Sequence, residues 1–194
     1  MSNLEKQLAF IKEIDKLKYI VRKTRLFNSP RHENDAEHSW HLAMMAVVLL
    51  EHSNHEVDLL KVIKMLLIHD IVEIDAGDTF LYDTKKSHDN TEEELMAAKR
   101  IFGMLPEAQG TELLALWEEF EAGASKEAQF AKSMDRLEPM MQNASNEGGT
   151  WSEFDLHIDQ VTKNTVKIKP GSETLYEYAK GLTEEGMENG YIRP

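Results

Sequence analysis

The sequence predicts an all-α fold formed by one domain that covers residues 1–194. Apolar residues recur at intervals of three or four along most of the chain, which is the spacing of amphipathic helices. Glycine and proline separate these periodic stretches, and no run alternates in the way that would predict a strand. A hydrophobic content of 41% and a charged content of 29% are typical of a globular protein.

Three helices are expected in the first half of the chain. The first runs from about residue 4 to the break at residues 28–30, where Asn, Ser and Pro end the periodic pattern. The second runs over about 36–51, and the third over about 58–73. The third contains an apolar run at residues 62–68 that indicates a buried helix. The residues expected to face inward on the second helix are Trp40, Ala43, Met44, Val47 and Leu50.

The second half of the chain is expected to contain five more helices. A polar loop between Gly77 and Asp89 precedes them. Thr91 and Glu94 have the form of a capping box, and Ser125 is placed to cap the longest helix. The expected helices run over residues 91–103, 106–123, 125–144, 152–166 and 173–185.

The composition excludes several classes of protein. A formal net charge of -13 argues against a protein that coats nucleic acid, because phosphate neutralisation requires a basic face. No apolar run approaches the roughly 20 residues needed to cross a bilayer, and the N-terminus lacks the features of a signal peptide. Without cysteine there is no disulfide and no thiolate metal site. We therefore expect a cytoplasmic protein that binds neither a nucleic acid polymer nor a membrane.

The dipeptide His69-Asp70 is the most informative feature of the sequence. It stands at the end of the buried apolar run, where two polar side chains are costly unless something pairs with them. His38 and Asp135 are two further ligand-type residues on expected helices. Imidazole and carboxylate groups suit first-row divalent metals. Each residue alone is more often a satisfied core or surface group, so the prediction of a metal site depends on the combination.

Three motifs together resemble those of the HD-domain metal-dependent phosphohydrolases. They are Glu37-His38-Ser39, His69-Asp70 and the segment Lys-Ser-Met-Asp-Arg at residues 132–136. The resemblance implies that the chain forms a single HD-domain helical bundle. It also implies an enzyme that hydrolyses phosphate esters with the help of a metal.

A narrower resemblance is to the 5'-deoxynucleotidase branch of that superfamily. It rests on residues 31–39, on residues 69–73 and on Gly77-Asp78. The motif-bearing core covers about residues 17–143, and C-terminal helices follow at about 150–190.

The resemblance implies that His38, His69, Asp70 and Asp135 bind one divalent metal. The identity of the ion stays open among Mn, Co, Fe, Zn, Ni and Mg, because a mixed nitrogen and oxygen set disfavours only a purely hard-ion site. His41 lies one turn after His38 and is interpreted as structural, because no second cluster of carboxylates accompanies it. A homodimer is also expected from the family.

Two carboxylates are the expected catalytic residues. Glu73 follows Asp70 by three residues and therefore shares its helical face. It matches a catalytic glutamate of the resembled branch, although an average Glu here would only cap or solvate the helix end. Asp78 matches an active-site residue that contacts the sugar or orients water. Asp75 competes with Asp78 when spacing alone is considered.

Binding of a phosphate requires cations, and Arg22 with Lys23 are the expected substrate-binding residues. Arg22 lies in a segment that resembles the one carrying a phosphate-binding arginine in the family. Lys23 stands where some relatives have an aromatic residue. Arg25 and Arg31 extend this basic stretch, which by itself is more often a solvated face. Arg136 is placed to orient its neighbouring ligand through an ion pair.

The leading functional interpretation is a metal-dependent hydrolase of the 5'-nucleotidase type, which removes the 5'-phosphate of (deoxy)nucleoside monophosphates. One alternative is an HD phosphohydrolase that acts on nucleoside triphosphates or other phosphoesters, although no obvious cluster of Lys and Arg for three phosphates is evident. Another is a non-catalytic nucleotide-binding module. The presence of both Glu73 and Asp78 argues against that module.

Overall fold

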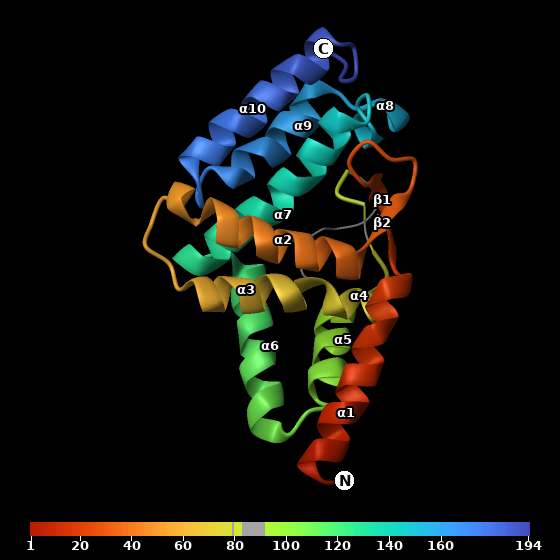
Figure 1. Ribbon diagram of the computed structural model, residues 1–194, viewed down its shortest axis with the longest axis vertical. Coiled ribbons are helices and arrows are strands. Elements are labelled where there is room, and N and C mark those ends of the chain that lie inside the picture. The colour runs from red at the N-terminus through yellow and green to blue at the C-terminus, as the bar shows by residue number, and fades with distance from the viewer. Residues whose placement is uncertain (79, 83–91) are drawn as a thin grey trace.

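Helices make up most of the described chain, and two short strands pair beside them (Figure 1). This computed structural model describes residues 1–78, 80–82 and 92–194. The prediction of a helical bundle is confirmed, whereas the expectation of no strand is wrong. The α-helices are α1 (Asn3–Ile14), α2 (Asp35–Leu49), α3 (Leu59–Ile68), α4 (Glu73–Ala76), α5 (Glu92–Phe102), α6 (Glu107–Ala122), α7 (Lys126–Ser145), α8 (Thr150–Glu153), α9 (Ile158–Thr165) and α10 (Glu173–Glu188). The 3-10 helices are η1 (Asp15–Tyr19), η2 (Leu50–His52), η3 (His69–Val72) and η4 (Val166–Ile168), and the strands are β1 (Val21–Arg25) and β2 (His32–Asn34).

A β-hairpin replaces the second half of the first expected helix. The α-helix ends at Ile14, η1 follows, and β1 then pairs antiparallel with β2, with Val21 opposite Asn34. The β-branched residues Val21 and Thr24 favour a strand, because their side chains lose freedom in a helix and pack well on a pleated surface. The hairpin places Arg22 on a strand rather than on a helix.

The inward face of α2 differs from the expected one. Trp40 is 64% exposed and Met44 is 43% exposed, and of the five residues expected to face inward only Ala43 is buried. The helix carries apolar residues on both sides, so apolar spacing could not distinguish its faces. The buried face packs against α3 and α7 and carries polar as well as apolar residues. Its buried residues are Asp35, His38, Ser39, Leu42, Ala43, Met45 and Ala46.

Helix α7 packs against helices on both sides of the α2–α3 pair. It packs against α2, α3, α6 and α10. In Figure 1, α9 and α10 lie on one side of the α2–α3 pair, while α1, α5 and α6 lie on the other. The largest fully buried side chains include Trp117 on α6, Phe130 on α7 and Trp151 on α8. Burial of such aromatic groups contributes much of the apolar area that stabilises a domain of this size.

Several expected helix ends are confirmed, and one expected helix is divided in two. Gly123 follows α6 with a φ of 60°, a left-handed conformation that favours glycine at the end of a helix. The Ser125 hydroxyl caps α7 as expected. The helix expected over residues 152–166 is instead broken into α8 and α9. Asp155, which has a φ of 51°, lies between them.

The capping box expected at Thr91 lies outside the described residues, as does most of the expected polar loop up to Asp89. None of the helices in the described part of the chain combines the length and the apolar character that a membrane crossing requires.

Candidate metal centre

Three of the four expected ligands meet where α2, η3 and α7 approach one another. The ligand atoms of His38, His69 and Asp135 all lie within 4.8 Å of one another. His38 Nε2 is 3.2 Å from Asp135 Oδ1, and His69 Nε2 is 3.7 Å from the same oxygen. Both histidines are buried. Residues far apart in the sequence therefore form a group small enough to hold one ion.

Asp70, the fourth expected ligand, lies beside this group. Its Oδ1 is 3.2 Å from His69 Nε2, and its Oδ2 is 3.9 Å from His38 Nε2. The same Oδ2 accepts a 2.8 Å hydrogen bond from Arg22 Nη1. Asp70 Oδ1 thus faces His69, while Oδ2 faces His38 and is shared with the arginine.

The local backbone explains how His69 presents its side chain. The α-helix ends at Ile68, and the chain tightens into η3, which carries both members of the His-Asp pair. The ring nitrogen Nδ1 of His69 lies 2.9 Å from the carbonyl oxygen of Leu66, to which it donates when it carries the proton. The indole of Trp117 donates to the His69 carbonyl at 3.2 Å. These contacts fix the ring so that Nε2 faces the other ligands.

The donor set fits a divalent metal. Buried imidazole nitrogens and carboxylate oxygens together suit first-row ions such as Mn, Fe, Co, Ni and Zn. His69 Nε2 is buried and has no hydrogen-bond partner among the described residues. A buried polar atom that is left unpaired is costly unless a ligand or water pairs with it. The residues present therefore provide an N- and O-donor site, although they do not select one ion.

The other nitrogen of His38 faces two glutamates that sequence analysis missed. His38 Nδ1 is 3.4 Å from Glu33 Oε2 and 3.4 Å from Glu138 Oε2, and both glutamates are buried. Glu138 could have been noticed, because it follows Asp135 by three residues on one helix. No signal pointed to Glu33, because the strand that carries it was not expected. His38, Glu33 and Glu138 also form a second candidate group of metal-type ligands.

His41 faces Glu138 rather than the three-ligand group. Its Nδ1 lies 3.3 Å from Glu138 Oε1. Burial alone would raise the pKa of Glu138, but hydrogen bonds from His38 and His41 outweigh it and lower that pKa to about 2. Glu138 is therefore a carboxylate anion that faces both histidines at neutral pH.

Glu73 has a strongly shifted carboxyl group near the ligands. Burial, followed by the negative charges of Asp70 and Asp78, raises the pKa of Glu73 to about 9. Its Oε2 is buried without a hydrogen-bond partner in the described part of the chain. A carboxyl group in this environment carries a proton at neutral pH, which is the form that a general acid requires.

Several carboxylates surround Arg22, and one of them, that of Asp35, was not expected from the sequence. Its Nη1 donates to Asp70 and also to Asp35 Oδ1 at 3.2 Å, and it lies 3.9 Å from Asp78 Oδ1. Asp35 is fully buried, and burial followed by the charge of Asp70 raises its pKa to about 7. The arginine side chain is 15% exposed and therefore reaches solvent from a largely buried position.

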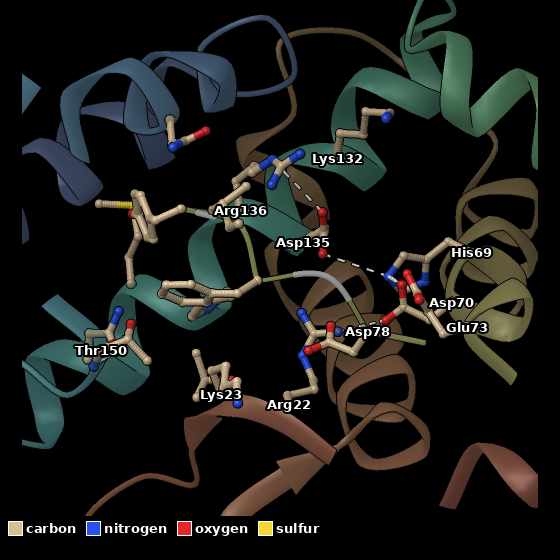
Figure 2. Close-up of a pocket in the computed structure, with 18 of the residues that line it drawn as sticks. Arg22, Lys23, His69, Asp70, Glu73, Asp78, Lys132, Asp135, Arg136 and Thr150 are labelled. Atoms are coloured by element: carbon tan, nitrogen blue, oxygen red, sulfur yellow. Dashed lines mark hydrogen bonds and ion pairs between the residues drawn. The ribbon is translucent and has the colours of Figure 1, made fainter. Parts of the chain in front are cut away.

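A cavity of about 180 Å³ opens beside the ligand group, and four cations line it (Figure 2). Figure 2 shows Arg22 and Lys23 on β1 at one side of the cavity, and Lys132 and Arg136 on α7 at the other. Lys23 has no carboxylate within 4.0 Å among residues 1–78, 80–82 and 92–194. The Arg136 Nε is 4.0 Å from Asp135 Oδ2, which agrees with the expected ion pair. The structure thus adds Lys132 to the three cations that the sequence had already indicated.

Of the remaining residues that the sequence offered for the site, Asp78 lines the cavity and the others pair elsewhere. Asp78 lines the cavity, whereas Asp75 pairs with Arg100, so position distinguishes the two competing aspartates. Arg25 forms an ion pair with Glu153. Arg31 pairs with Glu37 at 2.9 Å and is exposed. Neither Arg25 nor Arg31 lines the cavity in the part of the chain that is described.

Two named relatives are similar to this chain over about two thirds of their length. The 5'-deoxynucleotidase HDDC2 of Homo sapiens is 30% identical over 141 residues, which are 72% of this chain and 68% of that protein. The 5'-deoxynucleotidase HDDC2 of Bos taurus is 31% identical over 142 residues, covering 72% and 67% of the two chains.

Solved structures and a family match agree with this similarity. The crystal structure of a predicted metal-dependent phosphohydrolase from Magnetospirillum magnetotacticum is 48% identical, has a TM-score of 0.93 and covers 100% of this chain and 97% of that one. A conserved hypothetical protein from Pyrococcus furiosus, 24% identical with a TM-score of 0.66, covers 91% and 99% and shares the fold. Residues 14–176 match the HD domain family. The chain therefore belongs to the HD-domain family of metal-dependent phosphohydrolases.

Proposed function

We propose that this protein removes the 5'-phosphate of nucleoside monophosphates, with deoxynucleotides among its substrates. One observation carries the proposal: a group of metal-type ligands, a partly exposed arginine and a protonated carboxyl group converge on the same cavity. Hydrolysis of a phosphomonoester requires an activated water, a cation for the phosphoryl oxygens and a proton for the leaving oxygen. The resemblance to the 5'-deoxynucleotidases supports the choice of a nucleotide.

We assign the metal to His38, His69, Asp70 and Asp135, which hold one divalent ion. A divalent ion supplies Lewis-acid polarisation and makes a bound water more acidic. Glu33 and Glu138 lie behind His38 and hold its ring. Arg136 supports Asp135 from the cavity side.

Arg22 binds the substrate phosphate in this proposal. Asp35 and Asp70 both hold its Nη1, so the guanidinium group is fixed in the cavity wall before substrate arrives. A guanidinium group can donate two parallel hydrogen bonds to a phosphate, which a lysine cannot do. Lys23 adds positive charge at the same rim of the cavity.

Glu73 donates the proton to the leaving 5'-oxygen. In the metal-free protein, burial and two neighbouring aspartates disfavour its anion and raise its pKa to about 9, so the group is suited to hold a proton at this position. Asp78 lies within 3.9 Å of Arg22 and lines the same cavity. We assign to Asp78 the contact with the sugar or with the attacking water.

A second enzymatic function has support from the group of cations. Lys132 and Arg136 add two positive charges on α7 to those of Arg22 and Lys23. More than one phosphate could be neutralised in such a cavity, which favours nucleoside triphosphates as the alternative substrates. Lys132 is already paired with Glu121 at 3.7 Å, however, so the monophosphate remains the preferred substrate.

Phosphate release from dAMP, AMP and dATP, with each of several added metals, tests the proposal directly. We expect metal-dependent release from dAMP that is abolished by a chelator. Release from dATP alone would replace the proposal with the triphosphate alternative. No release from any of them, together with thermal stabilisation by nucleotide, would indicate a non-catalytic binding module.

We also propose that the protein forms a homodimer. Apolar side chains at the spacing of one helical stripe are exposed along α2, namely Trp40, Met44, Val47 and Val48. Exposed apolar stripes of this kind are typical of protein interfaces. Sedimentation velocity should find a dimer that Trp40→Glu converts to a monomer. A monomeric wild-type protein would contradict the proposal.

A further inference from the structure

One face of α7 runs along the whole cavity. Its cavity-lining residues follow a helical stripe at intervals of one, three or four residues, and they are Lys132, Asp135, Arg136, Pro139, Met140 and Asn143. The eight residue steps from Asp135 to Asn143 span about 12 Å along a helix axis. A phosphate, a pentose and a base laid end to end have a comparable length. A substrate whose phosphate lies near Asp135 therefore has its far end near Asn143.

The orientation of the Asn143 amide follows from its neighbours. The backbone N–H of Thr150 donates to Asn143 Oδ1 at 2.9 Å, and the Thr150 hydroxyl donates to the same oxygen at 3.0 Å. A backbone N–H can only donate, so the atom that it contacts must be the amide oxygen. The Asn143 NH₂ group is therefore directed away from Thr150, and it donates to no acceptor in the described part of the chain.

The turn between α7 and α8 is shaped around this amide. Gly149 has a φ of 43°, and a Cβ atom added there would lie 2.6 Å from Asn143 Oδ1. Only glycine allows both this backbone conformation and this close approach. Asn143 as a whole residue is 3% exposed, and it lines the cavity. An amide donor that is held in one orientation at the cavity wall, with no acceptor among the described residues, can pair with a group that arrives in the cavity.

Apolar and aromatic side chains line the same cavity. Met140 lies one turn before Asn143 on α7, and the ring centroid of Phe80 is 4.4 Å from that of Phe154, which directly follows α8. Figure 2 shows Thr150 at the opposite end of the cavity from His69. An end that combines a ring face with one fixed donor has the chemistry needed to bind a nucleobase.

We propose that Asn143 is a specificity-determining residue whose amide N–H donates to an acceptor atom of the nucleobase. This inference rests on the proposed nucleotidase function and adds the residue that distinguishes a nucleotide from a simple sugar phosphate. Thr150 holds the amide in the required orientation, and Arg22 binds the phosphate at the other end.

The test compares dAMP with 2-deoxyribose 5-phosphate, which has the same phosphate and sugar but no base. Asn143→Asp keeps the oxygen that Thr150 contacts and removes the donor. We expect kcat/KM for dAMP to fall about tenfold through KM, since one neutral hydrogen bond is lost. We expect kcat/KM for 2-deoxyribose 5-phosphate to stay within about twofold. Arg22→Ala should instead impair both substrates alike.

A second measurement needs no variant. Wild-type enzyme is assayed with 1-deaza-, 3-deaza- and 7-deaza-dAMP, each of which lacks one ring nitrogen acceptor. We expect one of them to show about a tenfold lower kcat/KM than dAMP. Equal kcat/KM for all four nucleotides, or equal losses of Asn143→Asp on both substrates, would overturn the inference. A wild-type protein that hydrolyses no nucleoside monophosphate would overturn the proposed function first, and the inference with it.

Discussion

His38 Nδ1 lies 3.4 Å from Glu138 Oε2, on the side of the imidazole ring opposite the Nε2 that faces Asp135. A proton on Nδ1 that is shared with a carboxylate leaves the lone pair of Nε2 available for a metal. Glu138 is an anion at neutral pH because hydrogen bonds from the two histidines outweigh its burial. This relationship accounts for a buried glutamate that would otherwise destabilise the core.

Replacement of that carboxylate should weaken metal binding. Glu138→Gln keeps the shape of the side chain but removes the charge that orients His38, so we expect metal affinity to fall about 10–100-fold. Competition with a chromogenic chelator measures the affinity. The matched control is Glu121→Gln, which changes a cavity carboxylate that pairs with Lys132 instead. Equal affinities for Glu138→Gln and wild type would show that Glu138 does not orient the ligand.

The metal itself should be present at one ion per chain. His69→Ala and Asp135→Asn each remove a member of the group whose ligand atoms lie within 4.8 Å of one another, so both variants should lose the ion. His41→Ala should keep it, because His41 faces Glu138. Elemental analysis and anomalous scattering measure occupancy and position. Two ions per chain would instead show that the group of Glu33, His38 and Glu138 also binds metal.

Loss of the phosphate-binding cation should impair catalysis without loss of metal. Arg22→Ala removes a charged hydrogen-bond donor, and we expect kcat/KM to fall about 10–100-fold. Lys23→Ala should have a smaller effect, because its side chain lacks the paired donors of a guanidinium group. Steady-state kinetics and metal content are measured on both variants. Similar losses in the two variants would mean that the phosphate-binding role is assigned to the wrong residue.

Glu73→Ala should slow turnover while the metal and the nucleotide still bind. A general acid of this kind typically contributes about 10²–10⁴-fold in rate, because the 5'-oxygen is a poor leaving group without a proton. The loss of rate in Glu73→Ala should be smaller with p-nitrophenyl phosphate than with a nucleotide, because its leaving group needs no proton. If Glu73→Ala slows both esters equally, or loses the metal, the general-acid role passes to Asp78.

The raised pKa of Glu73 predicts how the stability of the metal-free protein depends on pH. The unfolded chain releases this proton near its ordinary pKa of 4.5, whereas the folded protein keeps it up to about pH 9. The folded state therefore binds more protons between these values. The contribution of Glu73 to the free energy of unfolding is therefore complete below about pH 4.5 and is lost as the pH rises to about 9.

Glu73→Gln should therefore lose less stability than wild type between about pH 5 and about pH 9. Thermal unfolding in the presence of a chelator measures the difference. Asp35, whose pKa burial raises to about 7, acts in the same direction in both proteins. Parallel curves for the two proteins would refute the shift at Glu73.

The sequence predicted the bundle and the positions of the ligand motifs because both depend on local patterns. Helical spacing and end signals such as Gly123 and Ser125 are local, and they appear in the structure as expected. The hairpin was missed because its strands are short and because the pairing of β1 with β2 is not a periodic signal. The exposed face of α2 was assigned wrongly because apolar residues occur on both sides of that helix.

The surroundings of the ligands could not be predicted, because they depend on tertiary contacts. Asp35 and Glu33 approach Arg22 and His38 only once the hairpin has formed. Lys132 belongs to the cavity through the packing of α7, and its sequence neighbours give no sign of this. The roles of the predicted ligands and catalytic residues remain predictions until the variants are measured.

The 3-10 helix η3 determines the spacing between Asp70 and Glu73. The Glu73 N–H donates to the Asp70 carbonyl, and in this tight helix side chains three residues apart are eclipsed. An ordinary α-helical turn would rotate Glu73 by about 60° relative to Asp70 over the same three residues. The angle between the Asp70 carboxylate, proposed as a metal ligand, and the Glu73 carboxyl group, proposed as the general acid, is thus determined by the pitch of the main chain. A substitution that strengthens α-helical hydrogen bonding at this turn would misalign the two groups without changing either one.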